Sequence, residues 1–371
     1  MVALSSIHAS NVLISTHLPP HLVCVFLGGT SGIGESTLKA LVSHAVQPKI
    51  YLVGRNKASA ERIIEECKGL GPEGYVGGAE VIWLKADLSR MKAVVGVCED
   101  IKRRESKVNL VLLSTGTPSF DRSLTPEGLR AFLATAYYDR TLLIAHLTPL
   151  LLNASASDSL ARVVSVGCGC DEGIIYPTDF PALKIPFSAI RGHFGTLTTL
   201  TLEALAQHIV DASSGVTFIH ANPGLVRTPY QDRMTGWFGV FARTLMWVKK
   251  MTGEAIGIEE SGERHLHLLT SARYAPGGGP IADGTSPAIQ TNGSRAGDTQ
   301  ANDLDNASNS SKPNDVIHRT TMNAVYSLDK NGEPAGQNIV GLLNKYCEEG
   351  MIDNIWAWLK NEYDRVGVNL V

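Results

Sequence analysis

The sequence has no surplus of charge of either sign and few cysteines, which excludes several classes of protein. Its 371 residues include 33 Lys and Arg and 36 Asp and Glu, for a formal net charge of −3. Without a basic surplus the chain lacks the electrostatic signature of nucleic-acid binding, so we predict no nucleic-acid partner. The six cysteines are scattered along a chain long enough to bury a large core. They do not indicate a disulfide scaffold, and a reducing, cytoplasmic compartment is predicted.

The start of the chain lacks charged side chains altogether, since residues 1–34 contain no Lys, Arg, Asp or Glu. Pro19-Pro20 and three histidines interrupt the apolar residues there, so no run approaches the roughly 20 residues needed to span a bilayer. The segment has neither the basic n-region of a secretory signal nor the Arg-rich pattern of a transit peptide. We therefore predict that residues 1–21 form a capping segment ahead of the first strand.

Short runs rich in Val, Ile and Leu alternate with helix-like stretches along most of the chain. The runs lack period-2 alternation, as expected for strands buried on both faces. This alternation predicts an α/β fold, a doubly wound parallel sheet of the Rossmann-like type. The predicted strands are Leu22–Leu27, Lys49–Val53, Val81–Lys85, Val108–Leu113, Arg162–Val166, Val216–His220 and Asn323–Leu328. The predicted helices include Ser59–Cys67, Leu129–Leu152 and Phe194–Ile209.

One stretch, Pro276–Asp315, interrupts this pattern. It has no aromatic residue and is dominated by small and polar residues, so it cannot bury enough apolar surface to offset the entropy of ordering. We predict a disordered insertion there. It divides one domain into residues 22–275 and a last strand and C-terminal helix within residues 316–371. This helix is predicted to have an apolar face formed by Ile352, Ile355, Trp356, Leu359 and Tyr363. The face packs either against the domain or against a second subunit, and in the second case the protein is a homo-oligomer.

A glycine-rich motif, Gly28-Gly-Thr-Ser-Gly32-Ile-Gly34, follows the first predicted strand and precedes a helical stretch. Its glycines let the backbone turn tightly and approach a pyrophosphate at a helix N-terminus, where N–H groups point outward. Such a cluster can also be a simple βα turn, but its position between a buried strand and a helix favours a dinucleotide site. The predicted cofactor-binding residues in this motif are Gly28, Thr30, Ser31, Gly32, Ile33 and Gly34.

The spacing Gly-x-x-x-Gly-Ile-Gly resembles the short-chain dehydrogenase/reductase superfamily, and three later segments agree with this. Asp87-Leu88 resembles the family's adenine-contacting Asp, and Ser114-Thr-Gly116 stands where the family carries Asn-Asn-Ala-Gly. The segment from Asn222 to Thr228 resembles the family's Pro-Gly segment, whose Thr holds the nicotinamide carboxamide. The resemblance covers roughly residues 22 to 275 and resumes near 322; it is nearest to fungal specialised-metabolism reductases, with some likeness to retinol dehydrogenases. It implies cofactor contacts at Asp87, Leu88, Gly116, Pro223, Gly224 and Thr228.

The end of the second predicted strand bears on the choice of cofactor. It reads Val53-Gly54-Arg55-Asn56 and carries no acidic residue at its tip. A carboxylate there binds the ribose 2′-hydroxyl of NAD, whereas an Arg accommodates the 2′-phosphate of NADP. Arg55 and Asn56 therefore predict NADP(H), with a solvated surface Arg as the alternative.

The catalytic residues that the resemblance implies are a Tyr that donates a proton, a Lys that lowers its pKa and holds the ribose, a Ser and an Asn. The fifth predicted strand leads to Cys168 in the Ser position, shortly after Ser165. Tyr-x-x-x-Lys is absent from the expected region, where the best match is Phe187-Ser-Ala-Ile-Arg191. Counting back from Pro149 places Ala136 in the Asn position, next to Tyr137 and Tyr138.

These replacements point to an altered proton donor. Phe187 has no proton to give, and Arg191 keeps a charge that grips ribose hydroxyls but relays protons poorly. His193 lies about 200° from Arg191 around a helix and is predicted to face away. Cys168-Gly-Cys170 has no matching ligand pair, so no metal is predicted. The predicted catalytic residues are Cys168, Arg191 and Tyr176, with Tyr137 and Tyr138 as further phenols to consider.

The resemblance implies an NADP-dependent reductase or dehydrogenase with a non-standard proton donor, acting in secondary metabolite biosynthesis. A non-redox isomerase or cyclase on the same scaffold and a cofactor-binding pseudoenzyme are the alternatives. Apolar segments at Trp237–Ala242 and Leu245–Val248 stand where the family places its substrate lid, which favours a small hydrophobic metabolite. Core packing explains these segments equally well, and shallow membrane contact is not favoured.

Overall fold

The computed structural model describes residues 2–75, 77–116, 122–210, 214–228, 244, 255–274, 276 and 325–370. Apart from Pro276, the predicted insertion Pro276–Asp315 lies outside the described residues, and so do both predicted lid segments, Trp237–Ala242 and Leu245–Val248. The structure therefore tests the body of the domain and leaves those predictions as they stand.

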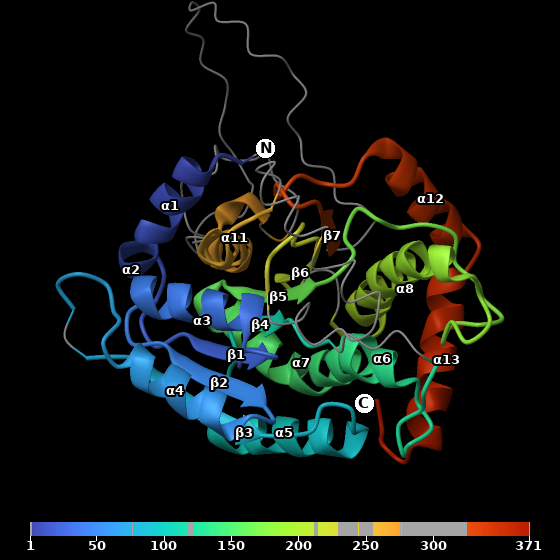
Figure 1. Ribbon diagram of the computed structural model, residues 1–371, viewed down its shortest axis with the longest axis horizontal. Helices are drawn as coiled ribbons and strands as arrows, with labels where there is room; N and C mark the ends of the chain where they lie inside the picture. Colours follow the sequence, from blue (N-terminus) through green and yellow to red (C-terminus); the bar gives the residue numbers. More distant parts are fainter. Residues whose placement is uncertain are drawn as a thin grey trace, which may run out of the picture.

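A seven-stranded parallel sheet forms the centre of the molecule, in the order β3-β2-β1-β4-β5-β6-β7 (Figure 1). The chain moves outward from β1 to β3, returns to pair β4 with the other edge of β1, and continues to β7. This is the doubly wound arrangement predicted from the sequence, and each predicted strand coincides with an observed one. The strands are β1 (Val23–Leu27), β2 (Lys49–Gly54), β3 (Glu80–Lys85), β4 (Leu110–Leu113), β5 (Ala161–Val166), β6 (Val216–Ala221) and β7 (Val325–Leu328).

Two hydrophobic cores form on opposite faces of the sheet because successive side chains of each strand point to opposite sides. In β1, Val23, Val25 and Leu27 enter one core, while Cys24 and Phe26 enter the other. The first core packs against α5 (Met91–Arg104), α7 (Asp139–Asp158), α8 (Ile190–Leu205), α12 (Gln337–Glu348) and α13 (Met351–Arg365). The second packs against α3 (Gly32–His44), α4 (Lys57–Cys67) and α11 (Ile258–Thr270). Burial of both strand faces explains the unbroken apolar runs in the sequence.

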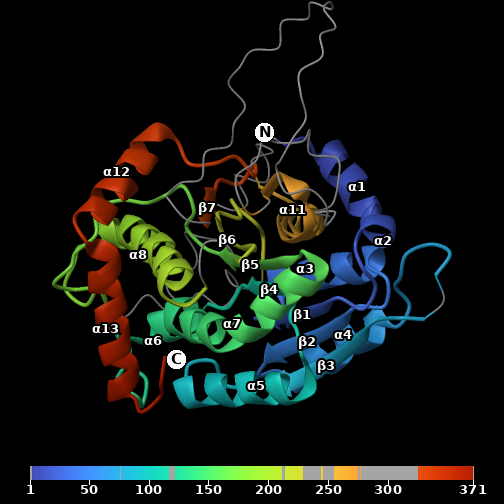
Figure 2. The same ribbon diagram turned by 180° about the vertical axis from the view of Figure 1, so that it is seen from behind.

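The N-terminal segment contains two helices, α1 (Leu4–Val12) and α2 (Ile14–His17). Helix α1 lies against α11, where Asn11 Nδ2 donates to Glu263 Oε2 at 2.7 Å. Helix α1 therefore lies beside α11, as Figures 1 and 2 show from opposite sides. Among the described residues, no helix has both the length and the apolar character required to cross a membrane.

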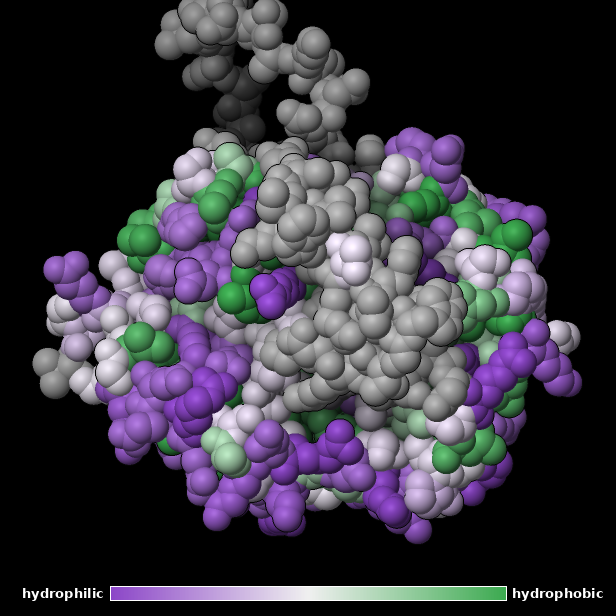
Figure 3. Space-filling model, viewed as in Figure 1, coloured by the Kyte–Doolittle hydropathy of each residue, from purple (hydrophilic) through white to green (hydrophobic). Residues whose placement is uncertain are grey.

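The C-terminal helix α13 lies alongside α8 (Figure 2). Ile355, Leu359 and Tyr363 of its apolar face are fully buried, and Tyr363 Oη donates to the backbone oxygen of Tyr138 at 2.7 Å. These side chains pack against the domain itself, the first of the two predicted possibilities. The described surface seen in Figure 3 is mainly hydrophilic, with hydrophobic residues scattered over it.

Candidate active site

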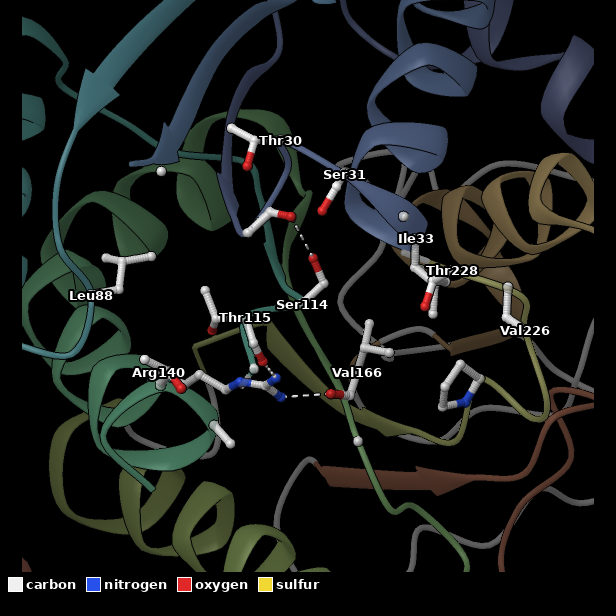
Figure 4. Close-up of a pocket in the computed structure, with 18 of the residues that line it drawn as sticks. Thr30, Ser31, Ile33, Leu88, Ser114, Thr115, Arg140, Val166, Val226 and Thr228 are labelled. Atoms are coloured by element: carbon white, nitrogen blue, oxygen red, sulfur yellow. Dashed lines mark hydrogen bonds between the residues drawn. The ribbon is translucent and has the colours of Figure 1, made fainter. Parts of the chain in front are cut away.

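A pocket of about 490 Å³ lies at the carboxyl ends of the parallel strands (Figure 4). Residues that follow β1 through β6 all contribute to its wall. The strand order reverses between β1 and β4 at this place, and open α/β sheets bind their ligands at such a reversal. The pocket contains these predicted site residues: Gly28, Thr30, Ser31, Gly32, Ile33, Arg55, Asp87, Leu88, Gly116, Cys168, Arg191, Pro223, Gly224 and Thr228.

The glycine motif turns sharply against the end of β4. Gly28 has φ +84°, and a Cβ atom there would lie 2.7 Å from the backbone nitrogen of Thr115. A Cβ atom at Gly34 would lie 2.5 Å from Ser114 Oγ and 2.8 Å from the backbone oxygen of Gly28. Both positions thus require glycine for close packing of the turn, although Gly34 does not itself line the described pocket. Gly34 packs against the backbone of Gly28 and Gly29 and so supports the glycine turn.

The N-terminus of α3 lies at the glycine turn and faces the pocket. The helix begins at Gly32, and the side chain of Ser31 makes no capping hydrogen bond to the described part of the helix. The first backbone N–H groups of a helix have no intrahelical partner, and an anion at the N-terminus satisfies them. Ser31, Gly32 and Ile33 line the pocket, so this end of the wall has the chemistry of a phosphate site.

Arg55 and Asp87 meet at the outer end of the pocket. The Arg55 side chain is 73% exposed, and its Nη1 lies 3.7 Å from Asp87 Oδ1. The same Asp87 oxygen accepts hydrogen bonds from the backbone nitrogen and Oγ of Ser89, at 3.2 and 2.8 Å. Asn56 has a different position: its Oδ1 accepts from the Ser59 N–H at 3.1 Å and caps α4, outside the described pocket wall. The geometry therefore joins Arg55 and Asp87 and gives the Asn56 side chain a helix-capping role.

Cys168, which follows β5, and Arg191, near the start of α8, both line the pocket. Arg191 Nη2 is 2.6 Å from Asp171 Oδ2, an oxygen that also accepts from Asn222 Nδ2 at 2.8 Å. Burial raises the pKa of the Cys168 thiol, and the nearby Arg191 charge offsets this only in part. Because the thiolate is the nucleophilic form of cysteine, this environment disfavours nucleophilic catalysis by Cys168.

The predicted aromatic and histidine candidates do not line the described pocket. Tyr176 packs on the core beside His193, with ring centroids 5.9 Å apart, and its backbone N–H donates to His193 Nδ1. His193 Nε2 must then carry the proton that bonds the Phe180 oxygen at 2.9 Å, so His193 is structural and faces away as predicted. Tyr176, placed near the reactive end from its loop position, is instead held against the core by this packing.

Tyr137, Tyr138 and Phe187 are also removed from the pocket wall. Tyr137 Oη bonds Thr201 Oγ1 at 2.5 Å, and Tyr138 packs between Trp358 and Tyr363. Phe187 lies in the 3₁₀ turn Phe187–Ala189 ahead of α8 and is 61% exposed. Tyr137 and Tyr138 are buried in the core and Phe187 is exposed to solvent, so none of the three rings lies at the reactive end of the pocket.

The sequence holds one Tyr-x-x-x-Lys spacing, from Tyr326 to Lys330. It begins on β7 rather than on α8, and Tyr326 is buried with its ring 5.8 Å from that of Tyr274. A strand residue inside the core cannot present its hydroxyl to the pocket. This spacing therefore does not replace the family's Tyr and Lys.

Arg140 is a pocket residue that the sequence reasoning missed. Its Nη1 donates to the Val166 oxygen at 2.6 Å and its Nη2 donates to the Thr115 oxygen (Figure 4). Its Nη1 also donates to Ser165 Oγ at 2.9 Å. One buried guanidinium thus joins the ends of β4 and β5. The available signal was its position one helical turn after Ala136, because residues four apart share a helix face. A π-helical turn, Ala134–Tyr138, precedes it, and such turns are frequent at functional sites.

A buried hydrogen-bond chain lies behind Cys168. The Cys168 N–H donates to His220 Nε2 at 3.0 Å, so His220 Nδ1 carries a proton and donates to Thr199 Oγ1 at 2.8 Å. Thr199 in turn donates to Glu172 Oε1 at 2.7 Å, and Ser327 Oγ donates to the same oxygen at 2.6 Å. Burial, with Arg140 and Arg191 nearby, lowers the pKa of His220 to about 3. The neutral imidazole therefore supports the backbone beneath the Cys168 position.

The glycine turn, the open helix N-terminus and the pocket at the strand reversal define a dinucleotide-binding α/β protein. The KR domain family model matches residues 23–124. The chain is 35% identical over 280 residues to "Oxidoreductase andH" of Emericella variicolor, covering 74% of this chain and 77% of that protein. It is 31% identical over 282 residues to "Short-chain dehydrogenase/reductase SAT2" of Stachybotrys chartarum, covering 70% and 76%.

A solved structure shares the fold: L-sorbose reductase from Gluconobacter frateurii complexed with NADPH and L-sorbose, with a TM-score of 0.50 and 16% sequence identity. The similarity covers 69% of this chain and 91% of that one. With relatives above 30% identity along most of their length, the chain belongs to the short-chain dehydrogenase/reductase family.

Proposed function

We propose that the protein is an NADP(H)-dependent oxidoreductase that interconverts a ketone and an alcohol on a small hydrophobic metabolite. The observation that carries the choice of cofactor is Arg55, whose exposed guanidinium enters the pocket from the end of β2. No acidic residue stands at the tip of that strand to bind a ribose 2′-hydroxyl, whereas Arg55 offers a partner for a 2′-phosphate. The names of the family relatives support the oxidoreductase class.

The residues of the pocket fit the cofactor in size and chemistry. The Gly28 and Gly34 positions have no room for a Cβ, and the N-terminus of α3 is free to receive a pyrophosphate. Asp87 would contact the adenine, Arg191 the ribose hydroxyls and Thr228 the nicotinamide carboxamide. Bound NADPH would supply the hydride, while this chain's residues hold it and orient the substrate.

The reactive end of the pocket supports a hydrophobic substrate and a changed proton donor. Phe132, Val166 and Val226 contribute apolar wall, and the pocket is also lined by Cys168, Arg191 and Ala136, which the sequence aligns with the family's Ser, Lys and Asn. We further propose a role in secondary metabolite biosynthesis, which the fungal relatives support. A cytoplasmic location agrees with the six cysteines, which are all free thiols.

Calorimetric titration of the full chain with NADPH and with NADH tests this proposal. We expect NADPH to bind at least about tenfold more tightly, because a charge-assisted contact to the 2′-phosphate is absent with NADH. Arg55→Ala should remove this preference. Arg103→Ala, which changes an exposed arginine of α5 outside the pocket, is the matched control and should keep it. Equal affinity of the unaltered chain for both cofactors would overturn the assignment.

Cofactor consumption with a panel of hydrophobic ketones tests the chemistry separately. Oxidation of NADPH in step with alcohol formation supports the reductase. Conversion of a substrate without any net NADPH oxidation would instead identify an isomerase or cyclase. Tight cofactor binding with no conversion across the panel would identify a pseudoenzyme, and either result would refute the proposed reaction.

A further inference from the structure

Three side chains place buried polar atoms at the wall of the pocket, beside its reactive end. Thr115 follows β4, Thr135 belongs to the π-helical turn, and Asp139 begins α7 one turn after Thr135. Both threonines line the pocket. None of their hydroxyl oxygens, nor Oδ2 of Asp139, makes a hydrogen bond of standard geometry among the described residues, although the Thr115 hydroxyl lies close enough to stabilise the Asp139 carboxylate. Most buried polar atoms in proteins are hydrogen-bonded, so this cluster points to a polar group or water that occupies the pocket during function.

Asp139 is fully buried, and groups from three elements face it. Its Oδ1 accepts from the Arg140 N–H at 2.8 Å. Burial raises the pKa of Asp139 to about 7, although the Arg140 guanidinium and the Thr115 hydroxyl lower it in part. Tyr363 of α13 is the third neighbour, and burial keeps the pKa of that phenol well above its usual value. A buried carboxyl group that titrates near neutral pH both holds and releases a proton under working conditions.

The position of Asp139 matters because the family's donor is missing. Phe187 carries no proton, and Ala136 leaves the Asn position without a polar group. Asp139 lies three residues after Ala136 and therefore on nearly the same face of the helix. Thr115 links Asp139 to the pocket. The Thr115 hydroxyl lowers the pKa of Asp139, and Thr115 also forms part of the pocket wall.

We propose that Asp139 holds the proton consumed in carbonyl reduction and that the Thr115 hydroxyl passes it into the pocket. The inference rests on the proposed function. The carbonyl carbon accepts a hydride from the reduced nicotinamide, and the carbonyl oxygen takes the proton of Thr115 Oγ. Thr115 takes a proton from the Asp139 carboxyl group in the same step, which leaves a carboxylate beside Arg140. Solvent returns the proton after product release.

Steady-state kinetics with a converted ketone test the relay. We expect Thr115→Val and Asp139→Asn to lower kcat by about 10²- to 10⁴-fold, the usual contribution of general acid catalysis. Thr115→Ser keeps a hydroxyl and should restore most of the rate. Thr148→Val on the same helix and Asp100→Asn on α5 are matched controls outside the pocket and should change little.

The pH profile separates a relay from a purely structural role. In the unaltered enzyme kcat for reduction should fall as the pH rises through about 7, because only protonated Asp139 can donate. Asp139→Asn should lack this limb. A limb that persists in Asp139→Asn, or undiminished turnover by Thr115→Val, would overturn the proposal. If Asp139→Asn does not fold, the comparison of Thr115→Val with Thr115→Ser decides.

Thermal unfolding without cofactor gives a readout independent of activity. The raised pKa means that the folded state favours the protonated carboxyl, so its stabilising effect is lost as the pH rises through about 7. The Tm of the unaltered chain should therefore fall between about pH 4 and pH 7 relative to that of Asp139→Asn, and the difference should level off above this range. Parallel Tm curves would contradict the assignment. NADPH affinity should be unchanged in Asp139→Asn, because Asp139 does not line the pocket, so loss of the relay with intact NADPH binding is distinguishable from failure of the proposed function.

Discussion

The backbone N–H of Cys168 donates to Nε2 of His220, 52 residues further along the chain, at 3.0 Å. This bond joins the loop after β5 to the interior of β6, and it places the Cys168 side chain at the pocket wall. His220 is 1% exposed and passes its other proton to Thr199. The loop that carries the family's Ser position is thus supported by a buried imidazole rather than by local turn chemistry.

We predict that His220→Leu destabilises the fold. The substitution leaves the Cys168 N–H and the Thr199–Glu172 pair without their buried partner, and each unsatisfied buried group costs about 1–3 kcal/mol. Urea unfolding followed by circular dichroism should show a loss in this range. His8→Leu on the exposed side of α1 is the control and should change stability by less than about 0.5 kcal/mol. Equal stability of the two variants would show that the buried hydrogen bonds of His220 contribute nothing to the free energy of unfolding.

Gly34→Ala should weaken both folding and cofactor binding. The added methyl group would meet Ser114 Oγ at 2.5 Å and backbone atoms of Gly28 and Gly29, and overpacking of this kind costs about 1–3 kcal/mol. Gly96→Ala on α5 is a matched control, because a Cβ there meets no atom within 4 Å. That control should stabilise the protein by about 0.4–1 kcal/mol. Tm and NADPH calorimetry on both variants check the contrast.

Arg162→Met should cost about 2–4 kcal/mol, since several buried acceptors lose their donor at once. Arg162 is buried in β5 and donates to the backbone oxygens of Leu268, Ser271 and Tyr274 at the end of α11. Burial lowers its pKa to about 10, so the guanidinium remains charged at neutral pH. The free energy of unfolding measures this loss. A variant as stable as the parent chain would mean that α11 is held by its apolar contacts alone.

The double substitution Phe187→Tyr with Arg191→Lys recreates the family's spacing, yet we expect no gain on simple ketones. The Phe187 ring is 61% exposed in the turn before α8, outside the described pocket wall. A tyrosine there would not reach the reactive end. Loss of the Arg191 contacts to Asp171 should weaken NADPH binding modestly instead. Steady-state rates with unactivated ketones check this, and a clear increase in kcat would show that the turn closes onto the substrate.

Local signals in the sequence were sufficient to predict the strands of the sheet and most of the cofactor-binding residues at their carboxyl ends. Strands buried on both faces appear as unbroken apolar runs, and the glycine turn, Arg55 and Asp87 each follow directly on a strand end. Parallel strands bring all their carboxyl ends to one edge, so residues at those ends meet whatever the loops between them do. That is why most of the predicted cofactor residues line one pocket. The disordered insertion remains a prediction from composition.

The identity of the polar groups at the reactive end was decided only in three dimensions. Tyr176 and Phe187 lie in the long connection from β5 to α8, where Asp179 accepts three backbone N–H groups and Arg130 donates to the Pro181 and Ala182 oxygens. These contacts turn Tyr176 onto the core, and no sequence spacing encodes them. Asp139 and Thr115 are 24 positions apart and become neighbours because α7 packs on β5, the strand that pairs with β4. Burial of that carboxyl group, which sets its pKa, is a property of the packed structure and not of the residue.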